Sequence, residues 1–165
     1  MLVIRIAILS ILVLMSGCSS FHPLYGTAAN GENIAATLAS IAVVEQHTRA
    51  GQLVRNEILS TSGAGGASKF ELHLTPKEAT IAVSDLAGTN TKRKRYSLSV
   101  AFELLDLKSG SIVNSGASFA NVSFDTVREP VADLQAFNSA QSRAAQEVGQ
   151  DLRQRLAAFL SSHKG

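Results

Sequence analysis

The sequence contains one dense cluster of cationic side chains, the consecutive residues Lys92, Arg93, Lys94 and Arg95. They precede a segment, 96–104, in which apolar and polar residues alternate strictly, so they are expected to open a β-strand. Because successive side chains of a strand point to opposite faces, Lys92 and Lys94 should share its apolar face and the two arginines the other. Cations at such a sheet tip can bind phosphate or carboxylate groups, arginine with bidentate geometry. The alternative is a solvated run of charge that protects an edge strand from aggregation.

The only cysteine, Cys18, follows a segment typical of a secretory signal. Arg5 precedes a short apolar run, 6–15, and small residues lie directly before the cysteine. This apolar core is too short to span a bilayer as a mature helix. A cysteine directly after small residues resembles a lipoprotein signal, which predicts that residues 1–17 are removed and that Cys18 is acylated on its sulfur and nitrogen. The alternative is an ordinary signal peptide with an incidental cysteine.

An acylated Cys18 would tether the exported chain to a membrane surface. Each buried methylene contributes about 0.8 kcal/mol, so two or more acyl chains are enough for stable anchoring. The next residue is Ser19 and not aspartate, which in Gram-negative bacteria resembles the lipoproteins sorted to the outer membrane. We therefore expect a lipid-anchored protein on the periplasmic face of the outer membrane. With a single cysteine it can form no internal disulfide, so its fold must depend on its core.

The other polar residues form no catalytic or metal-binding pattern. The four histidines are scattered, without a cysteine or carboxylate at ligand spacing; they are His22, His47, His73 and His163. Three acidic residues lie near the ends of predicted strands, and roles in turns or on exposed faces explain them without catalysis: Asp85, Glu103 and Asp106. The formal net charge of +2 indicates no global preference for nucleic acid. We therefore predict a protein that is not an enzyme and that uses no metal or cofactor.

Periodicity predicts the elements that position the basic cluster. The β-rich run 39–44 predicts a first strand, and Thr48 is expected to cap a helix that continues to Leu59. Apolar residues recur at helical spacing from Leu134 to Leu160 and predict a long second helix. Between the helices, alternation predicts strands at 70–83, with Pro76 at a bulge or edge position, at 96–104, and at 111–125 after a turn at 106–110. This order predicts an α+β fold with two helices packed on one face of a four-stranded mixed β-sheet.

These predictions divide the chain into three parts. Residues 1–17 are expected to be a lipoprotein signal peptide. Residues 18–33 are polar and glycine-containing, which is typical of an irregular, lipidated arm that leads away from the membrane. Residues 34–165 are expected to form a single α+β domain.

Several segments occur in an order that is familiar from one protein family. The most specific are Cys18-Ser-Ser-Phe-His-Pro-Leu-Tyr-Gly26 and Leu53-Val-Arg-Asn-Glu-Ile-Leu59. A basic residue also enters Tyr96-Ser-Leu-Ser-Val100, and an alanine-rich helix ends the chain. With these features the chain resembles the LPS-assembly lipoprotein family (LptE-type), particularly its alphaproteobacterial branch, over essentially the whole mature sequence.

The resemblance implies a function in LPS transport. It implies a domain that sits in the lumen of the outer-membrane LPS-transport β-barrel (LptD-type), acts there as plug and assembly partner, and binds LPS during its insertion into the outer leaflet. By position, the family's basic residues at the sheet tip correspond to Lys92, Arg93, Lys94 and Arg95, which become the candidate LPS contacts. Cations could hold the phosphates of lipid A and so compete with the divalent ions that hold LPS aggregates together.

Three alternatives stay open at this point. A different non-catalytic outer-membrane interaction lipoprotein, of the pilotin or tether type, would bind another partner and not LPS. A lipid-carrier lipoprotein would need a large apolar cavity between helices and sheet, against which the polar residues of one predicted sheet face argue. An enzyme would require perturbed carboxylates in a deep pocket.

Overall fold

The structure, a computed structural model, describes residues 34–60, 67–85, 91–127 and 129–162. The predicted signal peptide, the predicted arm and Cys18 lie outside these ranges. In chain order the elements are α2 (Ile34–Ala39), β1 (Ile41–Val43), α3 (Arg49–Leu59), β2 (Phe70–Asp85), β3 (Thr91–Asp106), β4 (Ser111–Val127) and α4 (Pro130–Ser162). The predicted α+β fold is confirmed. The six residues of α2 were not predicted, because a helix this short shows no helical period in the sequence.

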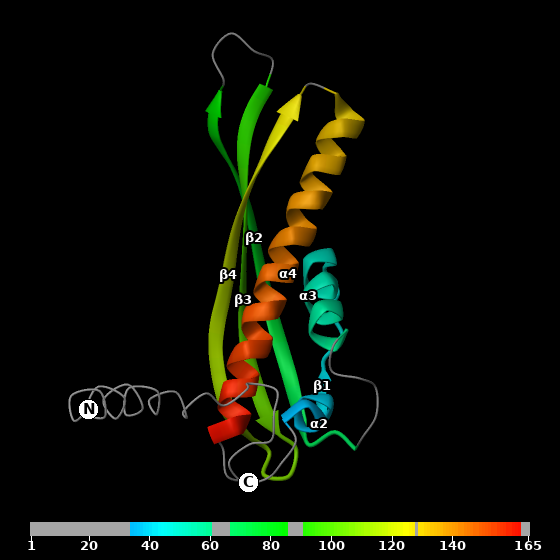
Figure 1. The fold of residues 1–165 in the computed structure, drawn as a ribbon, viewed down its shortest axis with the longest axis vertical. Helices are drawn as coiled ribbons and strands as arrows, with labels where there is room; N and C mark the ends of the chain where they lie inside the picture. The colour runs from blue at the N-terminus through cyan, green and yellow to red at the C-terminus, as the bar shows by residue number, and fades with distance from the viewer. Residues whose placement is uncertain (1–33, 61–66, 86–90, 128, 163–165) are drawn as a thin grey trace, which may run out of the picture.

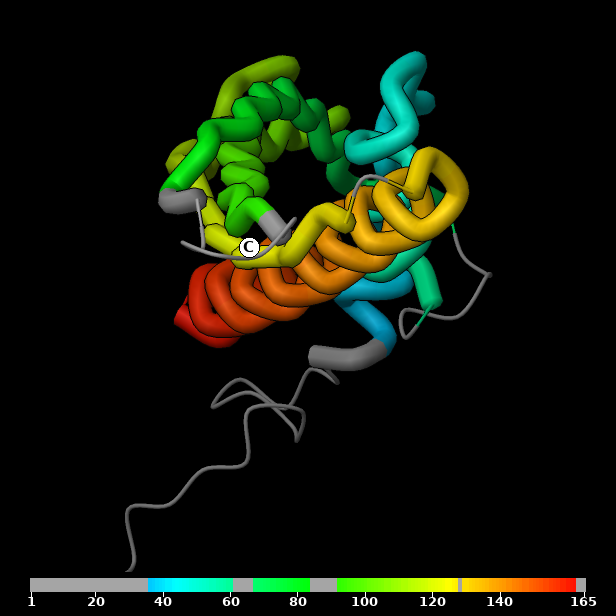
Figure 2. The backbone as a smooth tube through the Cα atoms, turned by 90° about the horizontal axis from the view of Figure 1, so that it is seen from above, coloured from blue at the N-terminus to red at the C-terminus, as the bar shows by residue number. Residues whose placement is uncertain are grey.

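The four strands form one mixed sheet in the order β1-β2-β3-β4. β1 is parallel to β2, and the three long strands are antiparallel to one another. In Figure 1 the long strands run the length of the molecule, with α4 beside them and α3 beside α4. Seen end-on, the strands curve around the side on which both helices lie (Figure 2). Both predicted helices therefore cover the same face of the sheet.

Pro76 lies inside β2, directly opposite Val100 and without a register shift. β1 pairs with β2 only at Phe70–Leu72, so Pro76 stands where the other edge of β2 pairs with no strand. A missing N–H breaks no ladder hydrogen bond there, which confirms the predicted edge position. The irregularity in the β2–β3 ladder comes later, between Ala82 and Ser84.

The predicted hairpin turn at 106–110 joins β3 to β4. The carboxylate of Asp106 accepts hydrogen bonds from the backbone N–H of Lys108, at 3.0 Å, and from the hydroxyl of Ser109, at 2.8 Å. These hydrogen bonds lower the pKa of Asp106. Gly110 has a φ of 68°, a conformation that glycine adopts without a steric penalty.

The core lies between the curved sheet and the helices. The alternating apolar residues of β3 all face inward and are at most 4% exposed: Tyr96, Leu98, Val100, Phe102 and Leu104. From α4, the predicted apolar stripe buries Val148, Leu152 and Leu156 completely. The prediction that Leu134 belongs to this buried stripe was wrong. Its side chain is 58% exposed, because the first turns of α4 extend beyond the packed core.

α3 packs against α4 through a close approach at Gly149. Thr48 caps α3 as predicted, its hydroxyl accepting a hydrogen bond from the N–H of Gly51 at 3.1 Å. A Cβ atom at Gly149 would lie only 2.6 Å from Cγ of Glu57 on α3. The carboxylate of Glu57 continues to Arg153, 3.3 Å away. Gly149, which costs about 1 kcal/mol of helix propensity relative to alanine, thus makes room for this contact.

Candidate functional site

The four consecutive cations lie at the start of β3, at the end of the sheet away from β1 and the β3–β4 hairpin (Figure 1). We call Lys92–Arg95 the basic tip. The predicted parity is confirmed, because Lys94 stands in register with the buried Phe124 and Arg93 with the exposed Asp125. The tip therefore presents cations on both faces of the sheet.

Arg93 is engaged within the protein. Its Nε donates a hydrogen bond to Oδ1 of Asp125 at 2.8 Å, and its Nη2 donates a hydrogen bond to Oδ2 of Asp125 at 3.1 Å. This bidentate pair raises the pKa of Arg93 and lowers the pKa of Asp125. Both side chains are about half exposed, so solvent screens the pair and it adds little to stability.

Lys94 and Arg95 are the cations of the tip that the protein leaves available. In the described part of the chain, neither makes an ion pair or a side-chain hydrogen bond. Arg95 is exposed on the outer face, in register with Ile81 and Ser123. Lys94 is half-buried on the helix side. Lys92 has an interaction partner of its own, and its carbonyl accepts a hydrogen bond from Thr126 at 3.3 Å.

A polar network directly behind the tip joins both helices to the sheet. The hydroxyl of Tyr96 on β3 donates to Oε2 of Glu78 on β2 at 2.6 Å. Gln141 on α4 donates to the same oxygen at 3.0 Å and accepts from Nε of Arg49 on α3 at 3.0 Å. Burial, and then the hydrogen bond to Glu78, raises the pKa of Tyr96, so its hydroxyl keeps its proton at physiological pH.

An aromatic contact reinforces this network. The ring of Phe137 on α4 packs edge-on against Tyr96, with centroids 5.6 Å apart, and against Phe124 on β4, at 6.1 Å. Such pairs contribute about 0.5–1.5 kcal/mol each beyond the area they bury. The network and the aromatic contact together fix the strands beneath the tip, so that Lys94 and Arg95 project from a rigid support.

The three acidic residues near strand ends do not come together. Asp85 is in register with Lys92, Glu103 with His73, and Asp106 with Phe70, so they are spread along the sheet from one end to the other. Among the described residues, no three His, Cys, Asp or Glu side chains converge as metal ligands.

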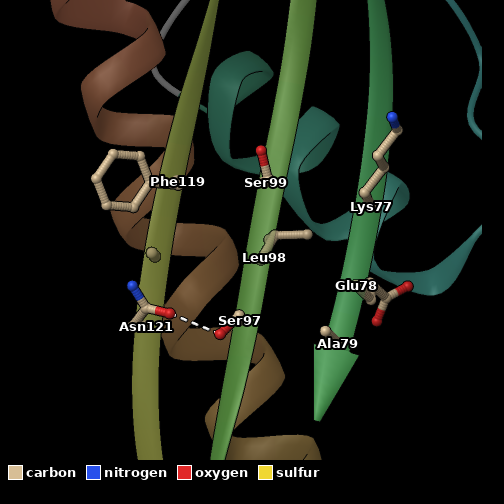
Figure 3. Close-up of a pocket in the computed structure, with 9 residues that line it drawn as sticks. Lys77, Glu78, Ala79, Ser97, Leu98, Ser99, Phe119 and Asn121 are labelled. Atoms are coloured by element: carbon tan, nitrogen blue, oxygen red, sulfur yellow. Dashed lines mark hydrogen bonds between the residues drawn. The ribbon is translucent and has the colours of Figure 1, made fainter. Parts of the chain in front are cut away.

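The outer face of the sheet carries a feature that was not predicted. Phe119 on β4 is 73% exposed in the middle of this face, where its neighbours are small or polar residues. It borders a shallow groove of about 200 Å³ whose outward-pointing residues include Ser97, Ser99 and Asn121. The Ser97 hydroxyl donates to Oδ1 of Asn121 at 2.6 Å (Figure 3). In the sequence, the one sign of this feature was an aromatic residue, Phe119, at a position of the predicted strand 111–125 where alternation directs the side chain outward.

Comparisons with known proteins identify related folds. No family model matches the sequence, and no curated protein is significantly similar to it. The crystal structure of a putative lipoprotein from Caulobacter crescentus CB15 is 25% identical, with a TM-score of 0.67 over 79% of this chain and 97% of that one. A minor lipoprotein from Acinetobacter baumannii shares the fold at 12% identity, with a TM-score of 0.52 over 72% of this chain and 90% of that one. The similarity to the Caulobacter protein supports the prediction that this chain is a lipoprotein. No described helix combines the length and apolarity needed to cross a bilayer.

Proposed function

We propose that this chain is an outer-membrane lipoprotein, anchored at Cys18, that plugs and helps assemble the LPS-transport β-barrel and binds LPS during its insertion into the outer leaflet. The observation that carries the proposal is the pair of available cations, Lys94 and Arg95, on two faces of a rigid sheet tip. The similarity to solved lipoproteins supports the class of protein, and the resemblance to the LPS-assembly lipoproteins supports the partner.

The chemistry of the tip suits the phosphates of lipid A. The guanidinium of Arg95 can bind two phosphate oxygens at once, and Lys94, the preceding residue on the other face of the strand, supplies a compact charge. Charge-assisted hydrogen bonds of this kind contribute about 1.5–3 kcal/mol each. By replacing divalent ions at the phosphates, the tip would release single LPS molecules from their aggregates.

The outer face of the sheet suits the interior of a barrel. The lumen of a transmembrane β-barrel is polar, and its wall can be contacted through water-mediated hydrogen bonds. Ser97, Ser99 and Asn121 offer hydroxyl and amide groups for such contacts. Phe119 adds one large apolar side chain, of the type that anchors many protein interfaces.

Asp125→Asn tests the role of the tip through a gain of binding. The substitution removes the carboxylate that pairs with Arg93 and so makes a third cation available to a phosphate. We expect the affinity for LPS to rise about two- to fivefold, because an exposed ion pair contributes about 0.5–1 kcal/mol. Equilibrium binding of fluorescent LPS measures the change.

The matched control for that substitution is Asp151→Asn. Asp151 also pairs with an arginine, Arg155, but on α4 and away from the tip. It should leave LPS affinity unchanged. If the wild-type protein did not bind LPS at all, the LPS-binding part of the proposal would be wrong.

A further inference from the structure

Large apolar side chains are exposed at the same end of the molecule as the basic tip. Among the described residues, five of the eight exposed large apolar side chains belong to this end: Ile81, Val83, Val127, Val131 and Leu134. We call these five the apolar collar. Single exposed apolar residues are ordinary on protein surfaces, and their concentration at the end that also carries the cations is what an interaction site would require.

The collar residues come from three elements that meet at this end of the molecule. Ile81 and Val83 belong to the last residues of β2, at the irregularity in its ladder with β3. Val127 ends β4, and its N–H donates to the side chain of Asp133 in the first turn of α4 at 2.7 Å. This hydrogen bond holds the end of β4 against the start of the helix. Figure 1 shows these ends of β2, β4 and α4 at one end of the molecule.

The collar flanks the basic tip on both faces of the sheet: Ile81 lies with Arg95 on the outer face, and Val131 and Leu134 belong to α4 on the side of Lys94. Ile81 stands directly opposite Arg95 in the β2–β3 ladder, and both side chains are exposed. Residues directly opposite in such a ladder have Cβ atoms about 5 Å apart. Val131 and Leu134, three residues apart on α4, lie on the same side of the helix and are 63% and 58% exposed. A ligand held by Arg95 would therefore lie against the exposed Ile81, and one that reaches Lys94 would meet the side of the sheet on which α4 lies.

We propose that this end of the molecule recognises an anionic amphiphile as a whole. Lys94 and Arg95 bind the phosphates of its headgroup, and the apolar collar covers the first methylenes of its acyl chains. The inference rests on the proposed function, since the ligand is the same phosphorylated lipid. It adds that the protein binds the chains as well as the headgroup.

The charges of the tip favour this occupant over a second copy of the chain. Two copies joined collar to collar would bring Lys94 and Arg95 of each close to the same cations of the other, which costs energy. An amphiphile with phosphates beside its chains complements both parts of the surface at once. Its headgroup pairs with the available cations and its chains cover the exposed apolar side chains.

The test uses a collar variant and a control variant of the full-length mature lipoprotein in neutral detergent. The collar variant is Ile81→Thr with Leu134→Gln, which keeps the strand and helix propensities of the two sites. The control is Ile112→Thr with Leu107→Gln, two residues at the opposite end of the sheet with similar exposure, 55% and 45%. The probes are fluorescent lipid A and the same phosphorylated disaccharide with its acyl chains removed.

We expect the wild-type protein to bind lipid A more tightly than the deacylated disaccharide. The collar variant should lose about tenfold or more in affinity for lipid A, as follows when several methylenes lose their apolar contact. Its affinity for the disaccharide should equal that of the wild type, and the control variant should bind both probes normally.

The other outcomes separate the inference from the proposed function. Equal lipid A affinity in the collar and control variants would overturn the inference and leave the proposed function intact. The inference would also be overturned if the collar variant lost affinity equally for lipid A and for the deacylated disaccharide. A wild-type dimer in sedimentation analysis that the collar variant no longer forms would overturn it as well. A wild-type protein that bound neither probe would instead contradict the LPS-binding part of the proposed function itself.

Discussion

The double substitution Lys94→Glu/Arg95→Glu is expected to lower the affinity for LPS by about a hundredfold or more. It removes the two cations of the basic tip, Lys94 and Arg95, for which the described part of the chain provides no ion pair. Two charge-assisted hydrogen bonds of about 1.5–3 kcal/mol each correspond to at least this change in the binding constant. The new carboxylates also repel the phosphates. Fold and stability should change little, because Arg95 is exposed and Lys94 only half-buried.

The control for this experiment is Lys69→Glu/Lys108→Glu. Both lysines are exposed at the opposite end of the sheet, and the change in net charge is the same. Binding should be measured at low and at physiological ionic strength, because salt screens long-range attraction more than direct contacts. If both double variants lost affinity equally, binding would depend on net charge and the tip would not be a site.

Leu152→Ala is expected to lower the free energy of unfolding by about 3 kcal/mol, within the usual range for a buried leucine. The side chain of Leu152 is fully buried in the middle of α4, where the helix packs against the sheet and α3. Its removal leaves a cavity that the long, regular strands cannot collapse to fill. Denaturant unfolding followed by circular dichroism measures the change.

Leu134→Ala provides the comparison on the same helix with the same chemical change. Leu134 is 58% exposed, so its truncation should cost less than about 0.5 kcal/mol. A similar cost at both positions would contradict the description of the core, because it would mean that the first turns of α4 are packed as tightly as its middle.

The inward faces of the long elements could be predicted from the sequence because they depend on local period alone. The alternation from Tyr96 to Leu104 determines which side chains of β3 are buried, wherever the neighbouring strands lie. The same alternation correctly assigned Lys94 and Arg95 to opposite faces. The apolar face of α4 was predicted equally well except at Leu134. There the helical spacing of apolar residues continues, but the helix has already passed beyond the core.

The state of each cation could not be predicted, because it depends on register between strands. Arg93 is engaged only because the β3–β4 ladder places Asp125 directly opposite. The hydrogen bond between Tyr96 and Glu78 depends in the same way on the β2–β3 ladder. Arg95 directly precedes the buried Tyr96. In the fold it is exposed on the other face of the strand.

The exposed apolar residues escaped prediction for a related reason. Phe119 and Ile81 fit a strand pattern as well as any buried residue does, and only the position of the helices shows that nothing described covers them. The acylation predicted at Cys18 lies outside the described residues and stays a prediction. Mass spectrometry of the mature N-terminus would test it.

The central claim is tested most directly by affinity co-purification of the tagged, full-length lipoprotein from outer membranes, with identification of any heat-modifiable β-barrel that accompanies it. We predict recovery of the LPS-transport barrel with one copy of the lipoprotein per barrel. Recovery of no barrel, or of a secretin in its place, would contradict the proposed function and would favour a different interaction lipoprotein.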